Sequence, residues 1–493
     1  MVRQVNKNIG SWLKPLLAII IAGGGLLWHL MACTESPMAF SPDGRKLAFV
    51  TMEPYDTDDI QRAGNHAFRL MVLTDQQYLK VIEETDKFLL SAPAFSPDGK
   101  SLCYLRVPLL TEETEVQLTE FYKQKQKYLD QLTAAPDKKL PEFEKSTPDQ
   151  PADTIDLTLP PADMTHKLWK YFITAELLPA VLVVRDAESF AEKSRIIVEL
   201  PVSDGAETEF LMTYLTAQPQ YSPDGQWIYL AAGCTIQAIN PDTRQIRFLA
   251  AHIAAADNPP VTIAALAPDG KNVAALLGDN EIILAFFQTD AQRAIYQRLK
   301  KSPPSCSGLA WSNNDILALL YAEPNQISDD TALVQLDFFR ADGSPLNSLK
   351  LQLPRLVKNK SSKINIEMDK GELALSADGK YMIIAYTENV YFLTTQGELL
   401  KHYRSDKDFL VGPTFTPEGK LVAFKHMTEK NDEQKYPRVL SIDYYTPRGE
   451  KVKSTQIPPS KLIPLIMEKK EKEKEKEKEK TTPPAARNPE SEW

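Results

Sequence analysis

Carboxylates that recur in one repeated motif are the first candidates for chemistry in this chain. Asp43, Asp98 and Asp224 each stand fourth in a pentapeptide that reads Phe or Tyr, then Ser, Pro, Asp and Gly. Neighbouring carboxylates can act as a general acid and a general base. The pentapeptide also has a structural use, because proline presets the first corner of a turn, aspartate suits the second, and glycine takes the left-handed position that follows. That use accounts for the aspartates, so we predict turn-building residues and no catalytic ones.

The common sequence signatures of catalysis and of metal or cofactor binding are missing. The chain contains no Gly-x-Ser-x-Gly nucleophile elbow, no His-Glu-x-x-His zinc motif and neither of the glycine-rich phosphate-binding loops. No two histidines lie within ligand spacing of each other. The histidines are His29, His66, His166, His252, His402 and His426. We therefore expect no enzymatic activity, no bound metal and no cofactor, although loops around an axis can still bring distant residues together.

The first 32 residues have the layout of a secretory signal peptide. Three basic residues and no acid occupy the first fourteen positions, and residues 15–32 form an apolar run interrupted only by His29. A small residue, Ala32, ends this run, and polar residues follow closely. Positive charge before an apolar segment is retained on the inner side of the membrane. We therefore expect the rest of the chain to lie outside the cytoplasm.

The end of this segment, Leu30-Met31-Ala32-Cys33, resembles the lipobox of bacterial lipoproteins. In that family the cysteine thiol receives a diacylglycerol and the signal is removed just before it, so the resemblance implies lipid attachment at Cys33. An uncleaved membrane helix and simple cleavage without lipid are the alternatives. All three place the body of the protein outside the cytoplasm, and the lipobox resemblance implies a bacterial cell envelope. The other cysteines, Cys103, Cys234 and Cys306, are buried small side chains or one disulfide with one free thiol.

The pentapeptide recurs, and most copies precede a stretch of alternating polar and apolar residues. The large residue before serine and the apolar residues after glycine point to one face of a hairpin. One hairpin cannot bury such a face alone, so neighbouring copies must stack. The copies are Phe40–Gly44, Phe95–Gly99, Tyr221–Gly225, Leu266–Gly270, Trp311–Asp315, Leu375–Gly379 and Phe415–Gly419.

The spacing of the copies predicts the number of blades. Most copies lie 40 to 64 residues apart, which is typical of a four-stranded propeller blade. The exception is the interval of 126 residues between Asp98 and Asp224. Part of this interval, 107–179, combines apolar residues at helical spacing, after a capping residue at Thr111, with a proline-rich polar stretch. We interpret 107–179 as an insertion in the second blade, which leaves an all-β, seven-bladed β-propeller; eight blades are the alternative.

Two places raise doubts about the regularity of this ring. The fifth copy has Asn313 where the others have proline and Asp315 where they have glycine, so the fifth blade is expected to be less regular. Residues 460–467 are a candidate for a closing strand, but Pro464 would confine that strand to an edge of its sheet.

The Pro-Asp motif resembles the repeats of TolB-like and WD40-like β-propellers and of the propeller domain of prolyl oligopeptidases. It is also similar to lipid-anchored envelope propellers such as LpqB. The resemblance covers most of residues 36–460 and is carried by short pentapeptides, so it implies a fold rather than an activity. The hydrolase half of the oligopeptidases has no counterpart, because the nucleophile motif is missing.

These features divide the chain into a signal peptide (1–32), a β-propeller (33–467) with its insertion (107–179), and a charged low-complexity tail (468–493), predicted to be disordered or transiently helical. The formal net charge of −9 disfavours nucleic acid as the main ligand. We predict a non-enzymatic, membrane-anchored envelope propeller that acts as a protein-interaction scaffold, sensor or accessory subunit. The alternative is an enzyme or a carbohydrate-binding propeller that uses the axial face. The insertion is either a recognition arm or a decoration packed against the propeller.

Overall fold

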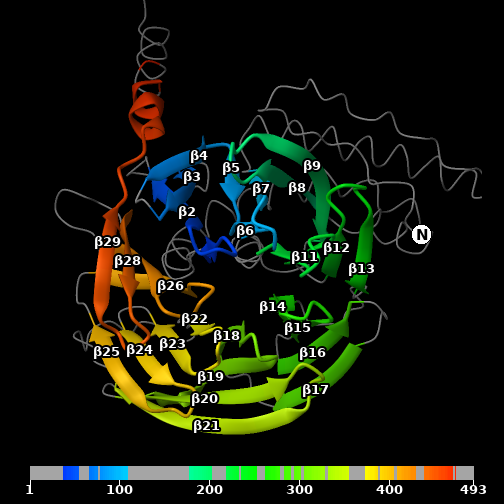
Figure 1. Cartoon of the computed structure of the whole chain (residues 1–493), viewed down its shortest axis with the longest axis vertical. Coiled ribbons are helices and arrows are strands. Elements are labelled where there is room, and N and C mark those ends of the chain that lie inside the picture. Colours follow the sequence, from blue (N-terminus) through cyan, green and yellow to red (C-terminus); the bar gives the residue numbers. More distant parts are fainter. Residues whose placement is uncertain are drawn as a thin grey trace, which may run out of the picture.

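A computed structural model describes most of the chain between Pro37 and Lys472. The described residues are 37–54, 66–75, 78–108, 177–201, 218–232, 235–251, 261–277, 282–289, 294–300, 305–327, 331–354, 372–386, 389–404, 408–428, 438–469 and 472. They form seven antiparallel sheets arranged as the blades of a propeller around a central axis (Figure 1). The predicted fold class, including the number of blades, is confirmed.

Each blade follows the chain outward from the axis, so that consecutive strands are neighbours in its sheet. The first blade comprises β1 (Ala39–Phe40), β2 (Lys46–Pro54), β3 (His66–Thr74) and β4 (Leu79–Thr85). The second comprises β5 (Phe88–Leu90), β6 (Ala94–Phe95), β7 (Ser101–Pro108), β8 (Leu177–Asp186) and β9 (Glu192–Pro201). The third comprises β10 (Gln220–Tyr221), β11 (Ile228–Ala232), β12 (Thr235–Ile239) and β13 (Ile246–Ala251). The fourth comprises β14 (Val261–Leu266), β15 (Asn272–Leu277), β16 (Ile282–Gln288) and β17 (Ala294–Lys300).

The remaining three blades follow the same order. The fifth comprises β18 (Ser305–Trp311), β19 (Ile316–Ile327), β20 (Thr331–Arg340) and β21 (Pro345–Pro354). The sixth comprises β22 (Glu372–Leu375), β23 (Tyr381–Tyr386), β24 (Asn389–Thr394) and β25 (Leu399–Arg404). The seventh comprises β26 (Asp408–Phe415), β27 (Val422–Thr428), β28 (Arg438–Tyr445) and β29 (Lys451–Gln456). A helix at 462–469 follows the last strand.

Burial in the blades follows the position of each strand. The third strand of the first blade, β3, is buried at every position from His66 to Leu73, because both faces of a middle strand pack against neighbouring blades. The outermost strand of the fifth blade, β21, is mostly exposed. Apolar clusters join adjacent blades; one of them unites residues of the first, second and third blades, among them Phe68, Tyr104 and Ile228.

The second blade differs from the others in its innermost strand, which is interrupted. β5 and β6 both pair with β7, on either side of residues 91–93. Ser91 bridges the interruption, since its backbone N–H donates to the Leu105 carbonyl and its Oγ accepts from the Leu105 N–H (2.9 Å). β7 and β8 pair directly and are neighbours in this blade. The two strands take in the ends of the predicted insertion (107, 108 and 177–179), and the rest of that prediction lies outside the described residues.

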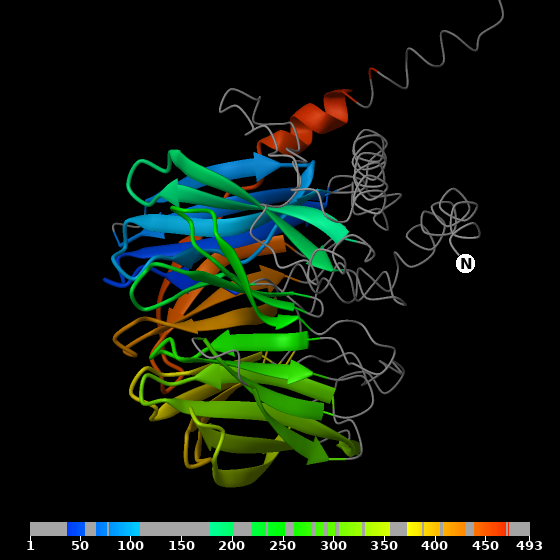
Figure 2. The same cartoon turned by 90° about the vertical axis from the view of Figure 1, so that its right-hand side faces the viewer.

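Antiparallel order gives the disc two different faces. The first and third strands of the blades end on one face, which we call the turn face. The second and fourth strands end on the other, which we call the connection face. Short turns gather along one side of the disc in Figure 2. β1 begins at the connection face, because it is a first strand and runs toward the turn face. β29 ends at the connection face, because it is a fourth strand and runs away from the turn face.

The ring closes without exchange of strands between the first and last blades, since each of these sheets is built from consecutive strands. An apolar cluster joins the two, with Leu47 and Phe49 of β2 packed among residues that include Ile442 and Tyr444 of β28. Beyond β29, residues 457–460 cross to the first blade; we call them the closing segment. The expected closing strand at 460–467 was therefore wrong.

The reason is local. The Ser460 Oγ accepts from the backbone N–H groups of Leu462 (3.1 Å) and Ile463 (3.4 Å), which is how a serine caps the start of a helix. Pro464 fits in the first turn of that helix, where its missing N–H is not needed.

Candidate interaction surface

The turn face is built from the repeated pentapeptide, and its serine and aspartate are bound within the turn itself. In the first copy the Ser41 Oγ donates to the Asp43 Oδ1 (2.6 Å) and accepts from the Lys46 N–H (2.8 Å). The same carboxylate oxygen accepts from the Arg45 N–H (3.1 Å). Gly44 has a φ of 72°, the left-handed conformation that glycine adopts without strain.

The same bonds recur in three more copies and keep their carboxylates ionised. The Ser96–Asp98, Ser222–Asp224 and Ser376–Asp378 pairs join at 2.7, 2.5 and 2.8 Å. The hydrogen bond from Ser96 holds the pKa of Asp98 below its ordinary value, and that from Ser222 does the same for Asp224. Carboxylates held in this way are poor proton donors near neutral pH.

Adjacent turns touch one another around the axis. A Cβ built on Gly44 would lie 3.6 Å from the Cδ of Pro417, in the turn of the seventh blade. The corresponding positions of Gly99 and Gly225 lie 3.7 Å from the Cδ atoms of Pro42 and Pro97. Each glycine thus faces the proline of the preceding blade, and the first turn meets the last. Proline and glycine of the motif therefore serve contacts between blades as well as their own turn.

The turn face carries exposed charges of both signs. Lys100 pairs with Asp98 (3.5 Å), Lys380 with Asp378 (3.1 Å) and Lys420 with Glu418 (2.8 Å). The lysine side chains remain 73 to 79% exposed, so each pair adds little to stability. The alternating charges are available to a partner surface.

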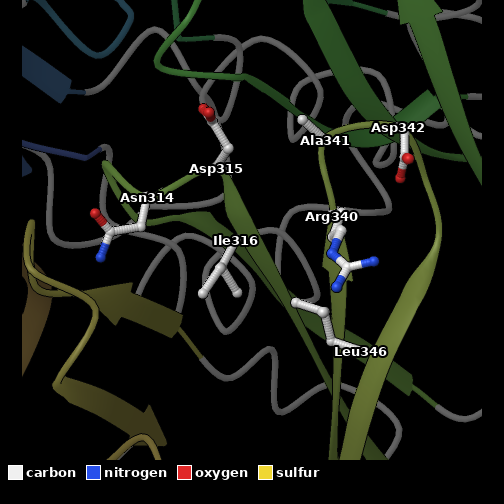
Figure 3. Close-up of a pocket in the computed structure, with 7 residues that line it drawn as sticks. All are labelled: Asn314, Asp315, Ile316, Arg340, Ala341, Asp342 and Leu346. Carbon is white, nitrogen blue, oxygen red and sulfur yellow. The ribbon is translucent and has the colours of Figure 1, made fainter.

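On the fifth blade, the turn face contains a pocket. Asp315 replaces glycine and still adopts a φ of 57°, so the turn keeps its shape and the fifth blade forms a four-stranded sheet in the usual order. The expected irregularity of this blade lies in its strand pairing, because the register shifts in all three of its pairings, most strongly between Ala322 and Ile327. The pocket, of about 470 Å³, lies between this turn and the β20–β21 turn (Figure 3). Its lining residues are Asn314, Asp315, Ile316, Arg340, Ala341, Asp342 and Leu346.

A polar cluster that the sequence analysis did not predict joins the first and second blades. Glu83 of β4 accepts from the guanidinium groups of Arg106 (2.6 and 2.7 Å) and Arg185 (3.0 Å), and from the Tyr104 hydroxyl. Burial would raise the pKa of Glu83, but the bonds from Arg106 and Tyr104 outweigh it and lower that pKa. The hydrogen bonds of these side chains join the first blade to the second, so we assign them a structural role.

A second polar cluster fastens the closing segment to the connection face of the first blade. Arg69 pairs with Glu53 and donates to the Pro458 carbonyl (2.8 Å). Glu53 also accepts from the Ser460 N–H (3.0 Å), and the Ser460 Oγ donates to Glu84. Arg69 and Glu53 are only 2% and 5% exposed. Burial lowers the pKa of Arg69 to about 10, which still leaves it charged at neutral pH.

The third cluster lies within the seventh blade around the fully buried Asp443. Its carboxylate accepts from Lys451 (2.6 Å) and Ser454, and it lies 3.0 Å from the His426 Nδ1. Burial would raise the pKa of Asp443, but the bonds from His426 and Lys451 outweigh it and hold that pKa well below its ordinary value. The group therefore stays ionised inside the sheet.

The predicted site residues have separate fates. Cys33 and the signal peptide lie outside the described residues, as do Cys234 and the histidines at 29, 166 and 252. Cys103 is a free, fully buried thiol, and burial raises its pKa to about 12. Among the described residues, no group of three or more metal-ligating side chains gathers, and no helix is long and apolar enough to cross a bilayer.

The described histidines lie in three different environments. His66 is buried at the start of β3, and His426 belongs to the cluster around Asp443. His402 stacks on the ring of Tyr391 at 4.7 Å and lies 2.9 Å from Asn389. The three stand on strands of the first, seventh and sixth blades, and the fold does not bring them into one site.

Similarity to known proteins is low. Neither a protein-family model nor a curated protein sequence matches this chain. Among solved structures, the Dos1 propeller is 9% identical, with a TM-score of 0.43 over 87% of this chain and 85% of its own. The Cps50 (Swd1) β-propeller domain of Myceliophteria thermophila is 13% identical, with a TM-score of 0.37 over 58% of this chain and 84% of its own. A prolyl endopeptidase is 11% identical, with a TM-score of 0.44 over 92% of this chain and 56% of its own.

Proposed function

We propose that this protein is a non-enzymatic β-propeller of the bacterial cell envelope, anchored by lipid on Cys33, that binds partner proteins as a scaffold, sensor or accessory subunit. The main support for a non-enzymatic role is that the aspartates of the repeated pentapeptide bond within their own turns. They are the acidic groups that the sequence repeats most regularly, and those of Asp43, Asp98, Asp224 and Asp378 are bound by their own turns. What the ring then offers a ligand is a rigid, charged surface.

The two faces of the disc support a division of roles. On the turn face, short and closely packed turns present paired charges and the pocket beside Arg340. The connection face holds both the start of β1, which follows Cys33 closely in the chain, and the closing segment. An anchor at Cys33 therefore belongs to the connection face and leaves the turn face free for partners.

The anchor and the partner are tested separately. Incorporation of radiolabelled palmitate into the full-length protein tests the anchor; Cys33→Ala should abolish it, with Cys103→Ala as the matched control that keeps it. Chemical crosslinking in intact cells, followed by mass spectrometry, tests the partner. Partner peptides joined to Lys100, Lys380 or Lys420 would support a protein-binding turn face. If the purified protein instead bound oligosaccharides or turned over a substrate at its axis, the non-enzymatic proposal would be wrong.

A further inference from the structure

The helix at 462–469 exposes apolar side chains that the propeller does not cover. Every residue from Leu462 to Met467 is apolar, and the side chains of Leu465 and Met467 are 62% and 48% exposed. The helix projects beyond the rim of the disc (Figures 1 and 2). Exposed apolar residues gathered on one short element usually mark a surface that meets a partner or a membrane.

The start of this helix is fixed in position. The buried Glu53–Arg69 pair binds the closing segment at Pro458 and Ser460, and Ser460 caps the first turn of the helix. The apolar residues that follow therefore leave the disc from a defined place, at the connection face beside the first blade.

The distance to Cys33 indicates which surface the helix meets. Only residues 34–36 separate Cys33 from Pro37, and an extended chain advances about 3.5 Å per residue, so the four steps reach roughly 14 Å. Pro37 precedes β1 at the same face from which the helix emerges. A lipid on Cys33 would hold this face next to the bilayer, within reach of the helix.

The charges around the helix fit the surface of a membrane. Lys461 precedes it, and Lys469 and Lys472 follow its apolar residues. Lysines at the ends of an apolar segment keep their ammonium groups at the level of the lipid head groups while the apolar side chains lie deeper. Glu468 is the acidic residue closest to the apolar run, and its negative charge is paired with the Lys472 ammonium at 2.6 Å.

We propose that the helix at 462–469 lies in the interface of the bilayer that holds the Cys33 lipid, with Leu465 and Met467 among its lipid-contacting residues. The proposal rests on the lipid anchor of the proposed function. It gives the disc a second contact with the membrane, next to the first, and so fixes the tilt of the propeller. The turn face then points away from the bilayer.

Site-specific photocrosslinking in intact cells tests this contact. A diazirine analogue of leucine is placed in the full-length protein at Leu465, or at Leu346 as the matched control, because Leu346 is an exposed leucine (39%) on the turn face. After irradiation, mass spectrometry should find phospholipid adducts at position 465 and none above background at 346. A protein adduct at 465, or equal lipid adducts at both positions, would overturn the proposal.

Palmitate labelling of the same cultures distinguishes failure of the helix contact from failure of the lipid anchor on Cys33. Labelled protein without lipid adducts at 465 would refute the helix contact and leave the anchor intact. Unlabelled protein would refute the anchor, and the adducts at 465 would still decide whether the helix meets lipid.

Discussion

Replacing Arg69 with methionine should open the ring between its first and last blades. The guanidinium of Arg69 is paired with Glu53 and bonded to the Pro458 carbonyl in a buried site. Methionine keeps much of the apolar length of the side chain, but the Glu53 carboxylate then loses its buried cation and keeps only the hydrogen bond from the Ser460 N–H of the closing segment. Breaking a buried ion pair from one side costs about 3–5 kcal/mol, which is a large part of the stability of an ordinary domain.

The matched control is Arg247→Met in the third blade. Arg247 is an exposed arginine whose guanidinium lies 4.2 Å from the centre of the Trp227 ring, a contact that contributes about 0.5–1 kcal/mol at exposed sites. Urea denaturation of the full-length proteins in detergent gives the two losses, and hydrogen exchange followed by mass spectrometry locates them. Exchange should accelerate first in β1–β3 and β26–β29. The reasoning is refuted if Arg69→Met costs no more than Arg247→Met, or if exchange accelerates equally in all blades.

Three further outcomes are expected. Gly270→Ala should lower the melting temperature more than Gly99→Ala, because both glycines have a φ of 71° but only a Cβ at position 270 would overlap Pro223, 2.8 Å from its Cγ. Asp443→Asn should destabilise the protein by about 3–5 kcal/mol at pH 7. Because folding lowers the pKa of Asp443, its contribution is fully present above about pH 4 and is lost only as the pH falls through the lowered folded value, so the gap between the urea midpoints of variant and wild type should narrow from pH 5 to pH 3 without closing. The Cys103 thiol is buried with its pKa raised to about 12, so a maleimide should modify it only after the protein unfolds, as read from the mass of its peptide.

The fold could be predicted from the sequence because one local device repeats. The proline, aspartate and glycine of each copy specify a turn without help from the rest of the chain, and their spacing counts the blades. The fifth copy shows the limit of that rule. Asp315 tolerates the left-handed conformation that glycine usually supplies, since short polar side chains can stabilise it, and the blade keeps its four-stranded order.

The polar clusters could not be predicted in the same way. Arg69 and Arg106 are single basic residues in largely apolar strands, which signals a partner but does not identify it. Glu83, the partner of Arg106, comes from the neighbouring blade, and Pro458, which accepts from Arg69, comes from the far end of the chain. A short repeated motif carries no information about such pairings between distant segments. The helix at 462–469 was missed because the apolar run was read as a strand and the capping role of Ser460 was overlooked.

The absence of strand exchange in the described blades has a consequence for how the protein is made. Translation delivers the first blade early and the seventh only after more than 350 residues have followed it. Until then Leu47 and Phe49 lack the seventh-blade residues that cover them in the finished ring, and unfinished sheets with open apolar faces tend to aggregate. We therefore expect the unfinished propeller to be prone to aggregation until its last blade has emerged.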